Sequence, residues 1–197
     1  MNKKIDLRGV LIRKEKPGDY REVEKMIRSA FWNVYKPGCD EHYLTKILRT
    51  HEDFLPDLTR IAVCDNKIVG AIFYAKSQIA CLNGKHSVIT FGPLGVHPNY
   101  QRQGIGELLI RETVELAKKS GFKAIIIYGE PDYYPRFGFR RCKEFEIAQP
   151  DGTYLDAMMA YELEPGFLKD KKGLFEVSPV YLNIKQEEVQ NYDRQFQ

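Results

Sequence analysis

Apolar residues recur every three or four positions in two segments of the chain, residues 20–34 and 104–120. This spacing places them along one face of a helix, so both segments are predicted to be helical. Asp19 and Glu22 form a capping-box pattern that would begin the first helix. Gly121 follows the second segment and would end that helix.

Other segments are rich in β-branched and apolar residues, which favour strands. Residues 60–64 and 68–76 flank a tight-turn sequence at 65–67, and residues 87–96 follow a second turn at 83–85. This pattern predicts three consecutive antiparallel strands joined by hairpins. The remaining predicted elements are strands at 10–13, 124–128, 142–147, 157–163 and 175–184, a helix at 41–50 and a short helical turn after residue 128.

The wholly apolar segment 124–128 has the composition of a central strand. It follows the strand at 87–96 and the helix at 104–120. A strand, a helix and a second apolar strand in succession form a right-handed crossover between parallel strands. The sequence therefore predicts an α/β (α+β) fold in which antiparallel hairpins precede one parallel pair.

The length of 197 residues fits one domain, and 43% apolar with 29% charged residues is typical of globular proteins. We expect this domain over residues 1–165 and a C-terminal extension over residues 166–197 that packs on it. Three roles stay open for the extension: an edge strand, a cover for a cleft, or the interface of a homodimer.

Charge and targeting patterns narrow the class of protein. The net charge is +3 with basic residues scattered among acidic ones, so nothing calls for nucleic acid or an anionic membrane as a partner. No apolar run approaches the roughly 20 residues that cross a bilayer, and no secretory signal is visible, so we expect a cytoplasmic protein. The four cysteines are widely spaced, which predicts reduced thiols and no metal site.

The segment 92–106 carries the most specific chemical signal. Here a strand ends, and Gly104 and Gly106 open a helix. The first N–H groups of a helix lack partners within it and lie at its positive end. Glycines let a phosphate approach that backbone, and Arg102 would add positive charge. Close packing or a tight turn would also require glycine, so the spacing alone leaves both interpretations open.

The string V-x-P-x-x-Q-x-x-G-x-G at residues 96–106 resembles the signature of the GNAT superfamily of N-acetyltransferases. The predicted strand order over about residues 10–163 is similar to that family as well. The resemblance implies the GNAT fold, with a mixed, mostly antiparallel central sheet of six to seven strands and flanking helices. It also implies a cleft between splayed fourth and fifth strands, and a bulge at Gly92 and Pro93 would favour such a splay.

The resemblance further implies that acetyl-CoA binds as the cosubstrate. Residues 101–106 would hold its pyrophosphate, and the backbone of residues 94–96 would pair with its pantetheine arm. The residues expected to bind acetyl-CoA are Leu94, Gly95, Val96, Gln101, Arg102, Gln103, Gly104, Ile105 and Gly106.

Residues 134–139 resemble a second motif of the family, Y-x-x-x-G-F, with Tyr134 at the tyrosine position. In many members this tyrosine gives a proton to the departing CoA thiolate. The alternative is that Tyr134 stacks on the cofactor or packs the core. Residues 129–132 replace the family's usual asparagine and longer helix, a compact form that resembles the YhbS-like subgroup of predicted acetyltransferases.

These resemblances imply an acyltransferase that moves an acetyl group to a primary amine by direct attack in a ternary complex. The alternative is a non-catalytic acyl-CoA sensor or partner-binding module with the same fold. Residues 87–96 contain no carboxylate, so the base that some members carry on the fourth strand is missing. Glu130 is the nearest replacement, and it equally suits a solvated turn.

The acceptor is expected to be a small-molecule or protein amine. The resemblance implies a pocket lined by the turn at 150–154 and by the link between the first two helices. The link residues concerned are Phe31, Trp32, Tyr35, Cys39 and Asp40. Aromatic and acidic groups together would hold a cation, or they would simply pack a helix end. His97, in the turn beside the loop, is expected to lie outside the chemistry.

Overall fold

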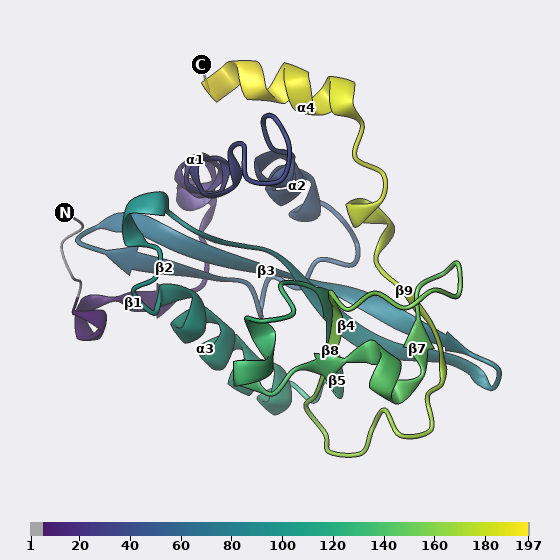
Figure 1. Cartoon of the computed structure of the whole chain (residues 1–197). Coiled ribbons are helices and arrows are strands. Elements are labelled where there is room, and N and C mark those ends of the chain that lie inside the picture. Colours follow the sequence, from purple (N-terminus) through teal and green to yellow (C-terminus); the bar gives the residue numbers. More distant parts are fainter. Residues whose placement is uncertain (1–5, 197) are drawn as a thin grey trace. The chain divides into compact units, whose positions relative to one another are not determined.

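Residues 6–196 are described by the computed structural model of the protein (Figure 1). The α-helices in this part of the chain are α1 (Tyr20–Phe31), α2 (Glu41–Leu48), α3 (Ile105–Lys119) and α4 (Gln186–Asp193). The first three confirm the predicted helices. α1 is shorter than predicted, because Asn33 has a φ of 59° and this left-handed conformation does not continue a helix.

Nine strands form one sheet within the described residues. They are β1 (Leu11–Arg13), β2 (Arg60–Cys64), β3 (Lys67–Cys81), β4 (Gly84–Val96), β5 (Ala124–Tyr128), β6 (Arg140–Arg141), β7 (Ile147–Ala148), β8 (Met158–Glu162) and β9 (Gly173–Glu176). The main path has the order β1-β2-β3-β4-β5-β8-β6, while β9 pairs with β3 and β7 with β9. β4 and β5 are parallel at Ile89 and Ile125, whereas β1–β2, β2–β3 and β5–β8 are antiparallel. The mixed, mostly antiparallel sheet is therefore confirmed. β7 and β9 extend it beyond the six to seven strands predicted.

The chain divides into two compact units. The first contains the chain up to Phe73, Pro93–Thr113 and the segment from Pro179 onward. The second contains Tyr74–Gly92 and Val114–Ser178. Three long elements, β3, β4 and α3, contribute residues to both units.

In the first unit, α1 packs on the end of β4. Val23, Ile27 and Ala30 are buried on the inner face of α1. A Cβ at Gly95 would lie 2.7 Å from Ile27 Cδ1 and 3.3 Å from the Cβ of Ala30. Glycine therefore permits a close approach of strand and helix that a side chain would prevent.

The start of α3 packs on β3, also within the first unit. A Cβ at Gly70 would lie 3.0 Å from Ile105 Cγ2 and 3.1 Å from Leu109 Cδ1. Both side chains are fully or almost fully buried. The first two turns of α3 are thus fixed against the sheet, which sets the position of the loop that precedes them.

The core of the second unit comes from strands and turns that surround β5. Its members are Ile79, Val88, Ala124, Ile126, Cys142, Ile147, Met158, Ala160, Leu168 and Phe175. The strand predicted at 142–147 is wrong here, because Cys142–Phe145 form a 3-10 turn and only Ile147–Ala148 are extended. Glu146 between them has a φ of 55°, which interrupts an extended chain.

The C-terminal part also differs from the prediction. The strand expected over 175–184 ends at Glu176, and Pro179–Tyr181 form a 3-10 turn. Proline has no N–H to give to a strand ladder. α4 follows in sequence that is largely polar, and it was not predicted. No helix within residues 6–196 combines the length and apolar character that a membrane span needs.

The capping box predicted at the start of α1 is wrong. The Asp19 carboxylate accepts a hydrogen bond from Lys16 N at 2.8 Å and pairs with the Arg13 guanidinium at 2.6 Å. It makes no capping bond to α1. The guanidinium supplies charge-assisted hydrogen bonds, which are stronger than a cap to a neutral amide.

Candidate functional site

The predicted cofactor residues lie wholly in the first unit, from the end of β4 to the start of α3. Val96 is the last residue of β4, and Pro98–Tyr100 form a 3-10 turn. The N–H of His97 donates to the carbonyl of Val69 at 2.9 Å. This bond ties the loop to the neighbouring strand β3.

Two glutamine side chains close the loop upon itself. Gln101 Nε2 donates to the carbonyl of Val96 at 3.0 Å, and Gln103 Nε2 donates to the carbonyl of Asn99 at 3.2 Å. Both residues were predicted to bind the cofactor. The structure shows in addition that their amides hold the shape of the loop.

Arg102 and Gly104 have left-handed backbone conformations, with φ of 59° and 91°. Turns of this kind form concave groups of N–H donors that bind anions. A Cβ at Gly104 would lie 2.9 Å from Leu7 Cδ1. Glycine adopts this conformation at 104 without strain, and a larger residue there would also require the Leu7 side chain to move. The exposed Arg102 side chain brings a positive charge to the same turn.

α3 begins at Ile105, and Leu108 N donates to the carbonyl of Gly104 at 3.0 Å. Helix geometry leaves the N–H groups before Leu108 without acceptors in α3, and they lie at its positive end. The Ile105 side chain is buried, whereas Gly106 is partly exposed. The start of α3 thus has the backbone and the electrostatics that a phosphate group requires.

The last residues of β4 alternate in exposure. Gly95 is buried against α1, whereas Leu94 and Val96 are partly exposed. Alternate residues of a strand lie on opposite faces. Leu94 and Val96 therefore share the face of the strand that α1 does not cover.

Tyr134 lies in the second unit, at the start of a 3-10 turn, and is 9% exposed. Its ring centroid is 5.8 Å from that of Phe91, 5.6 Å from Phe139 and 5.2 Å from Tyr133. A Cβ at Gly129 would lie 2.2 Å from Tyr134 Cε2. Aromatic neighbours and Gly129 together fix the ring in one position, which suits both roles predicted for it.

Glu130 is an exposed residue whose backbone organises the same turn. Its carbonyl accepts hydrogen bonds from Tyr133 N at 3.0 Å and from Tyr134 N at 3.3 Å. Its contribution within the second unit is therefore to the conformation of the chain before Tyr134.

His97 faces a groove of about 620 Å³ in the first unit, lined also by α1 and by the turn between β2 and β3. Its Nδ1 accepts a hydrogen bond from Asn99 N at 3.3 Å. Burial lowers the pKa of His97, and the charge of Lys67 acts in the same direction. None of the nine predicted cofactor residues lines this groove.

The link between α1 and α2, predicted to line the acceptor pocket, already holds cations of the protein itself. The Arg28 guanidinium carbon lies 3.8 Å from the ring centroid of Trp32. The Asp40 carboxylate pairs with Lys36 and accepts a hydrogen bond from Gln186 Nε2 at 2.9 Å. An acceptor cation would therefore compete with these internal partners.

The cysteines are free thiols, as predicted. Cys39 Sγ lies 3.4 Å from His42 Nδ1, and both residues are buried. Burial raises the pKa of Cys39 to about 12. The thiol is therefore protonated at neutral pH and is no nucleophile.

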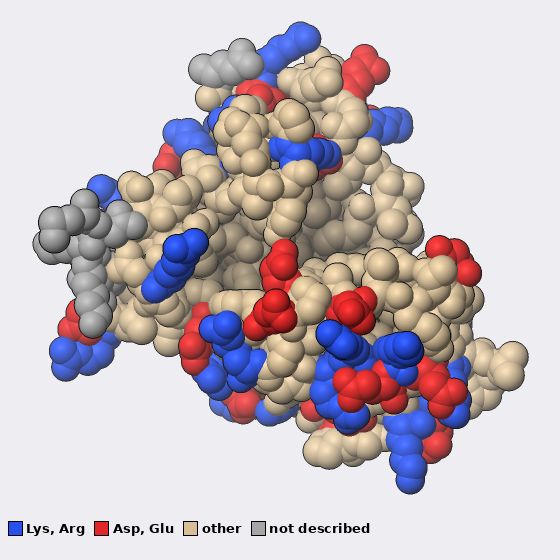
Figure 2. All heavy atoms as spheres, viewed as in Figure 1, with Lys and Arg blue, Asp and Glu red and all other residues tan. Residues whose placement is uncertain are grey.

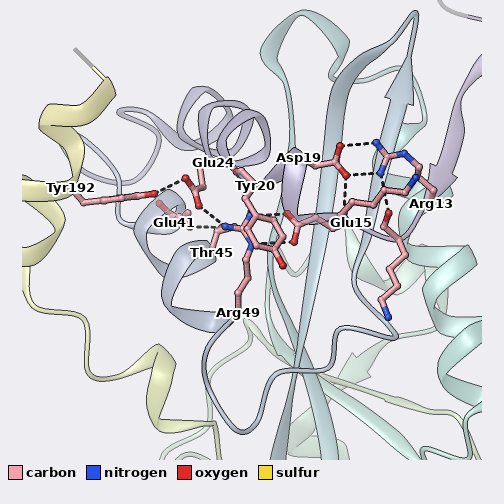
Figure 3. A network of polar contacts seen from close by, with 11 residues as sticks. Arg13, Glu15, Asp19, Tyr20, Glu24, Glu41, Thr45, Arg49 and Tyr192 are labelled. Carbon is pink, nitrogen blue, oxygen red and sulfur yellow. Dashed lines mark hydrogen bonds and ion pairs between the residues drawn. The ribbon is translucent and has the colours of Figure 1, made fainter.

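A buried network of charged groups in the first unit was not predicted from the sequence (Figure 3). Glu24 is 5% exposed; one of its carboxylate oxygens pairs with Arg49, and the other accepts a hydrogen bond from Tyr192 Oη at 2.5 Å. Arg49 also donates to both carboxylate oxygens of Glu15, at 2.7 and 3.0 Å. One feature of the sequence does indicate this network: Glu24 falls on the apolar face of α1. A charged residue on that face requires buried partners.

Charges of both signs mix on the surface. Figure 2 shows Lys and Arg interspersed with Asp and Glu on the face in view. Exposed pairs such as Arg140–Glu144, at 2.7 Å, illustrate the pattern.

The sequence model of the acetyltransferase (GNAT) family matches residues 24–139, which is more than half of the chain. The chain belongs to the acetyltransferase (GNAT) family. The predicted resemblance and the predicted acyltransferase class are thereby confirmed.

Two relatives come from Escherichia coli. The chain is 28% identical to the uncharacterized N-acetyltransferase YhbS over 169 residues, 85% of this chain and 95% of YhbS. It is 31% identical to the uncharacterized N-acetyltransferase YjhQ over 99 residues, 50% of this chain and 55% of YjhQ. The match thus spans about half the length of YjhQ and almost all of YhbS, which confirms the likeness to the YhbS-like subgroup.

Solved structures show the same fold. A GNAT family acetyltransferase from Brucella melitensis, in complex with acetyl-CoA, has a TM-score of 0.70 at 24% identity and covers 87% of this chain and 97% of its own. YhbS from Escherichia coli, in complex with CoA, has a TM-score of 0.78 at 22% identity and covers 89% and 93%. The GNAT fold predicted from the sequence is therefore confirmed.

Proposed function

We propose that this protein transfers an acetyl group from acetyl-CoA to a primary amine by direct attack in a ternary complex. The observation that carries the proposal is the loop before α3, in which left-handed turns at Arg102 and Gly104 precede helix amides that have no acceptors within α3. Relatives of this fold have been solved with acetyl-CoA and with CoA. An anionic cosubstrate with a pyrophosphate suits this loop better than a neutral ligand does.

Each part of the loop receives a role in this proposal. The amides around Gln103–Gly106 and the Arg102 side chain bind the pyrophosphate. The backbone of Leu94–Val96 pairs with the pantetheine arm, because the end of a strand offers amide and carbonyl groups in register. The side-chain bonds of Gln101 and Gln103 keep the loop in the binding shape before the ligand arrives, which lowers the entropic cost of binding.

The chemistry requires proton transfer at two atoms. The amine must lose a proton as its nitrogen bonds to the thioester carbonyl carbon, and the sulfur gains one as the C–S bond breaks. We assign the second transfer to the Tyr134 hydroxyl, because Phe91, Phe139 and Gly129 pack against its ring and hold it in one position. With no carboxylate in residues 87–96 and Glu130 exposed, we assign the first proton to solvent water. Solvent also returns a proton to the Tyr134 phenolate after CoA leaves as the thiol.

A second candidate function is an acyl-CoA sensor without catalysis. The missing carboxylate on β4 and the burial of Tyr134 favour it. Both functions require CoA binding, and only the enzyme requires the Tyr134 hydroxyl. Tyr134→Phe should therefore slow turnover by about tenfold or more while CoA affinity is unchanged. Unchanged turnover would remove the catalytic assignment.

CoA binding itself is tested by calorimetry with Gly106→Asp and Gly106→Asn. The two variants place side chains of equal size at the start of α3, and only aspartate repels a phosphate. We expect CoA to bind Gly106→Asp at least about tenfold more weakly than Gly106→Asn. Equal affinities would show that the pyrophosphate does not lie at this helix start.

A further inference from the structure

The C-terminal helix α4 makes polar contacts with α1 and α2 that the proposed chemistry does not use. All three helices belong to the first unit, and Figure 1 shows α4, in yellow, beside the other two. The Tyr43 hydroxyl donates to Glu188 at 2.7 Å, and Gln186 Nε2 donates to Asp40 at 2.9 Å. Val189 of α4 is buried.

One end of α4 completes the buried charged network (Figure 3). The two oxygens of the Glu24 carboxylate are divided between Arg49 and the Tyr192 hydroxyl. The side chains of Glu24 and Arg49 are each 6% exposed. Without Tyr192, one oxygen of a buried carboxylate would lose its donor, which is costly. α4 is therefore an integral part of the first unit.

Asp193 of α4 reaches the link between α1 and α2 through Arg28. Arg28 Nε and Nη2 donate to the two carboxylate oxygens of Asp193 at 2.6 and 3.2 Å. The same guanidinium covers the ring of Trp32, 3.8 Å from its centroid. Asp193 therefore fixes the cation that in turn fixes Trp32, the first residue after α1.

α4 thus acts on both ends of the link, directly at one end and through Arg28 of α1 at the other. Asp193 acts through Arg28 on Trp32 at the start, and Gln186 binds Asp40 at the end, where α2 begins. Between these ends, Gly38 N donates to Asn33 Oδ1 at 2.8 Å and closes the link as a loop. A helix that holds both ends of a closed loop restricts the orientation of the whole loop.

We propose that α4 is a positioning element for acceptor recognition, in which Asp193 sets the orientation of Trp32 through Arg28 and Gln186 sets that of Asp40. The inference rests on the proposed function and on the expectation from the sequence that the acceptor amine binds at this link. Its expected signature is an effect on the amine alone, because no residue of the cofactor loop contacts α4 in the bonds described above.

Trp32 is the single tryptophan of the chain, so its fluorescence reports on this position without any need for catalysis. The test compares Asp193→Asn with Glu187→Gln, which makes the same chemical change on an exposed face of α4. Asp193→Asn should raise the acrylamide quenching of Trp32, because Arg28 loses its charged partner. Glu187→Gln should leave it unchanged. Equal quenching of Trp32 in the wild type, Asp193→Asn and Glu187→Gln would overturn the proposal.

The kinetic arm uses the amine that gives the fastest CoA release. Asp193→Asn should raise KM for that amine at least about fivefold, with KM for acetyl-CoA unchanged, and Asp193→Glu should recover part of the loss. Equal changes in both KM values would indicate a general loss of structure and would contradict the positioning role. If no amine supports turnover, the proposed function fails, and the Trp32 measurement still decides whether α4 fixes the link.

Discussion

Gly129 lies directly against the ring of Tyr134: a Cβ at position 129 would be 2.2 Å from Tyr134 Cε2 and 2.6 Å from Cδ2. Phe91 and Phe139, also in the second unit, pack against the same ring and restrict its movement away from Gly129. The position of the proposed acid therefore depends on a residue with no side chain.

Gly129→Ala should force the Tyr134 ring out of place. We expect a loss of about 1–3 kcal/mol in the free energy of unfolding, together with turnover as low as that of Tyr134→Phe. Urea unfolding and single-turnover kinetics measure the two effects. Gly18→Ala is the control, because a Cβ at Gly18 meets nothing within 4 Å. Normal turnover in Gly129→Ala would mean that Tyr134 does not act from this position.

Gly95→Ala should strain the packing of β4 on α1. The added Cβ would meet Ile27 Cδ1 at 2.7 Å, so we expect a loss of about 1–3 kcal/mol in the free energy of unfolding. Ile27→Val removes that methyl group. In the Ile27→Val background the same glycine substitution should cost at least about 0.5 kcal/mol less. A double-mutant cycle from chemical denaturation measures this coupling, and strict additivity would refute the contact.

Tyr192→Phe should leave one oxygen of the buried Glu24 carboxylate without its donor. We expect it to lower the free energy of unfolding by about 1–3 kcal/mol. Tyr154→Phe, at a residue that is 45% exposed, makes the same chemical change on the surface and should cost less than about 0.5 kcal/mol. Equal losses in the free energy of unfolding for the two variants would show that Tyr192 of α4 does not stabilise the buried Glu24–Arg49 pair.

His42 should make the stability of the protein depend on pH. It is fully buried, and burial lowers its pKa, while the charge of Asp193 opposes the shift and that of Arg28 adds to it. Between the lowered pKa in the fold and about 6.5, the unfolded chain binds more protons. The contribution of neutral His42 to the free energy of unfolding is therefore fully present above about pH 6.5. It decreases as the pH drops toward the folded pKa. Denaturation curves at several pH values should show this slope in the wild type and a flatter profile in His42→Gln. A slope that persists in His42→Gln would assign the titration to another group.

The regular elements could be predicted because their signals are local. Apolar spacing located α1 and α3, and glycine at 104 marked a backbone conformation that other residues reach only with strain. The family motif at residues 96–106 allowed the fold to be predicted, since the sequence already predicted a strand before the motif and a helix after it. These features need no knowledge of distant contacts.

The remaining features depend on contacts between distant parts of the chain. α4 is polar and short, and Tyr192 and Asp193 are held by Glu24 and Arg28, more than a hundred residues earlier. Cys142–Phe145 form a 3-10 turn that ends at the left-handed Glu146, where β-propensity alone predicts a strand. The packing of Gly129 on Tyr134 was equally hidden, because a sequence shows that a glycine is present and not which ring it meets.

The most direct test of the central claim is release of free CoA from acetyl-CoA, followed with a thiol-reactive dye across a panel of primary amines. We predict amine-dependent release above the enzyme-free rate, lost in Gly106→Asp and retained in Gly106→Asn. No amine-dependent release from the wild type, in a preparation that binds CoA by calorimetry, would contradict the acetyltransferase and leave the acyl-CoA sensor.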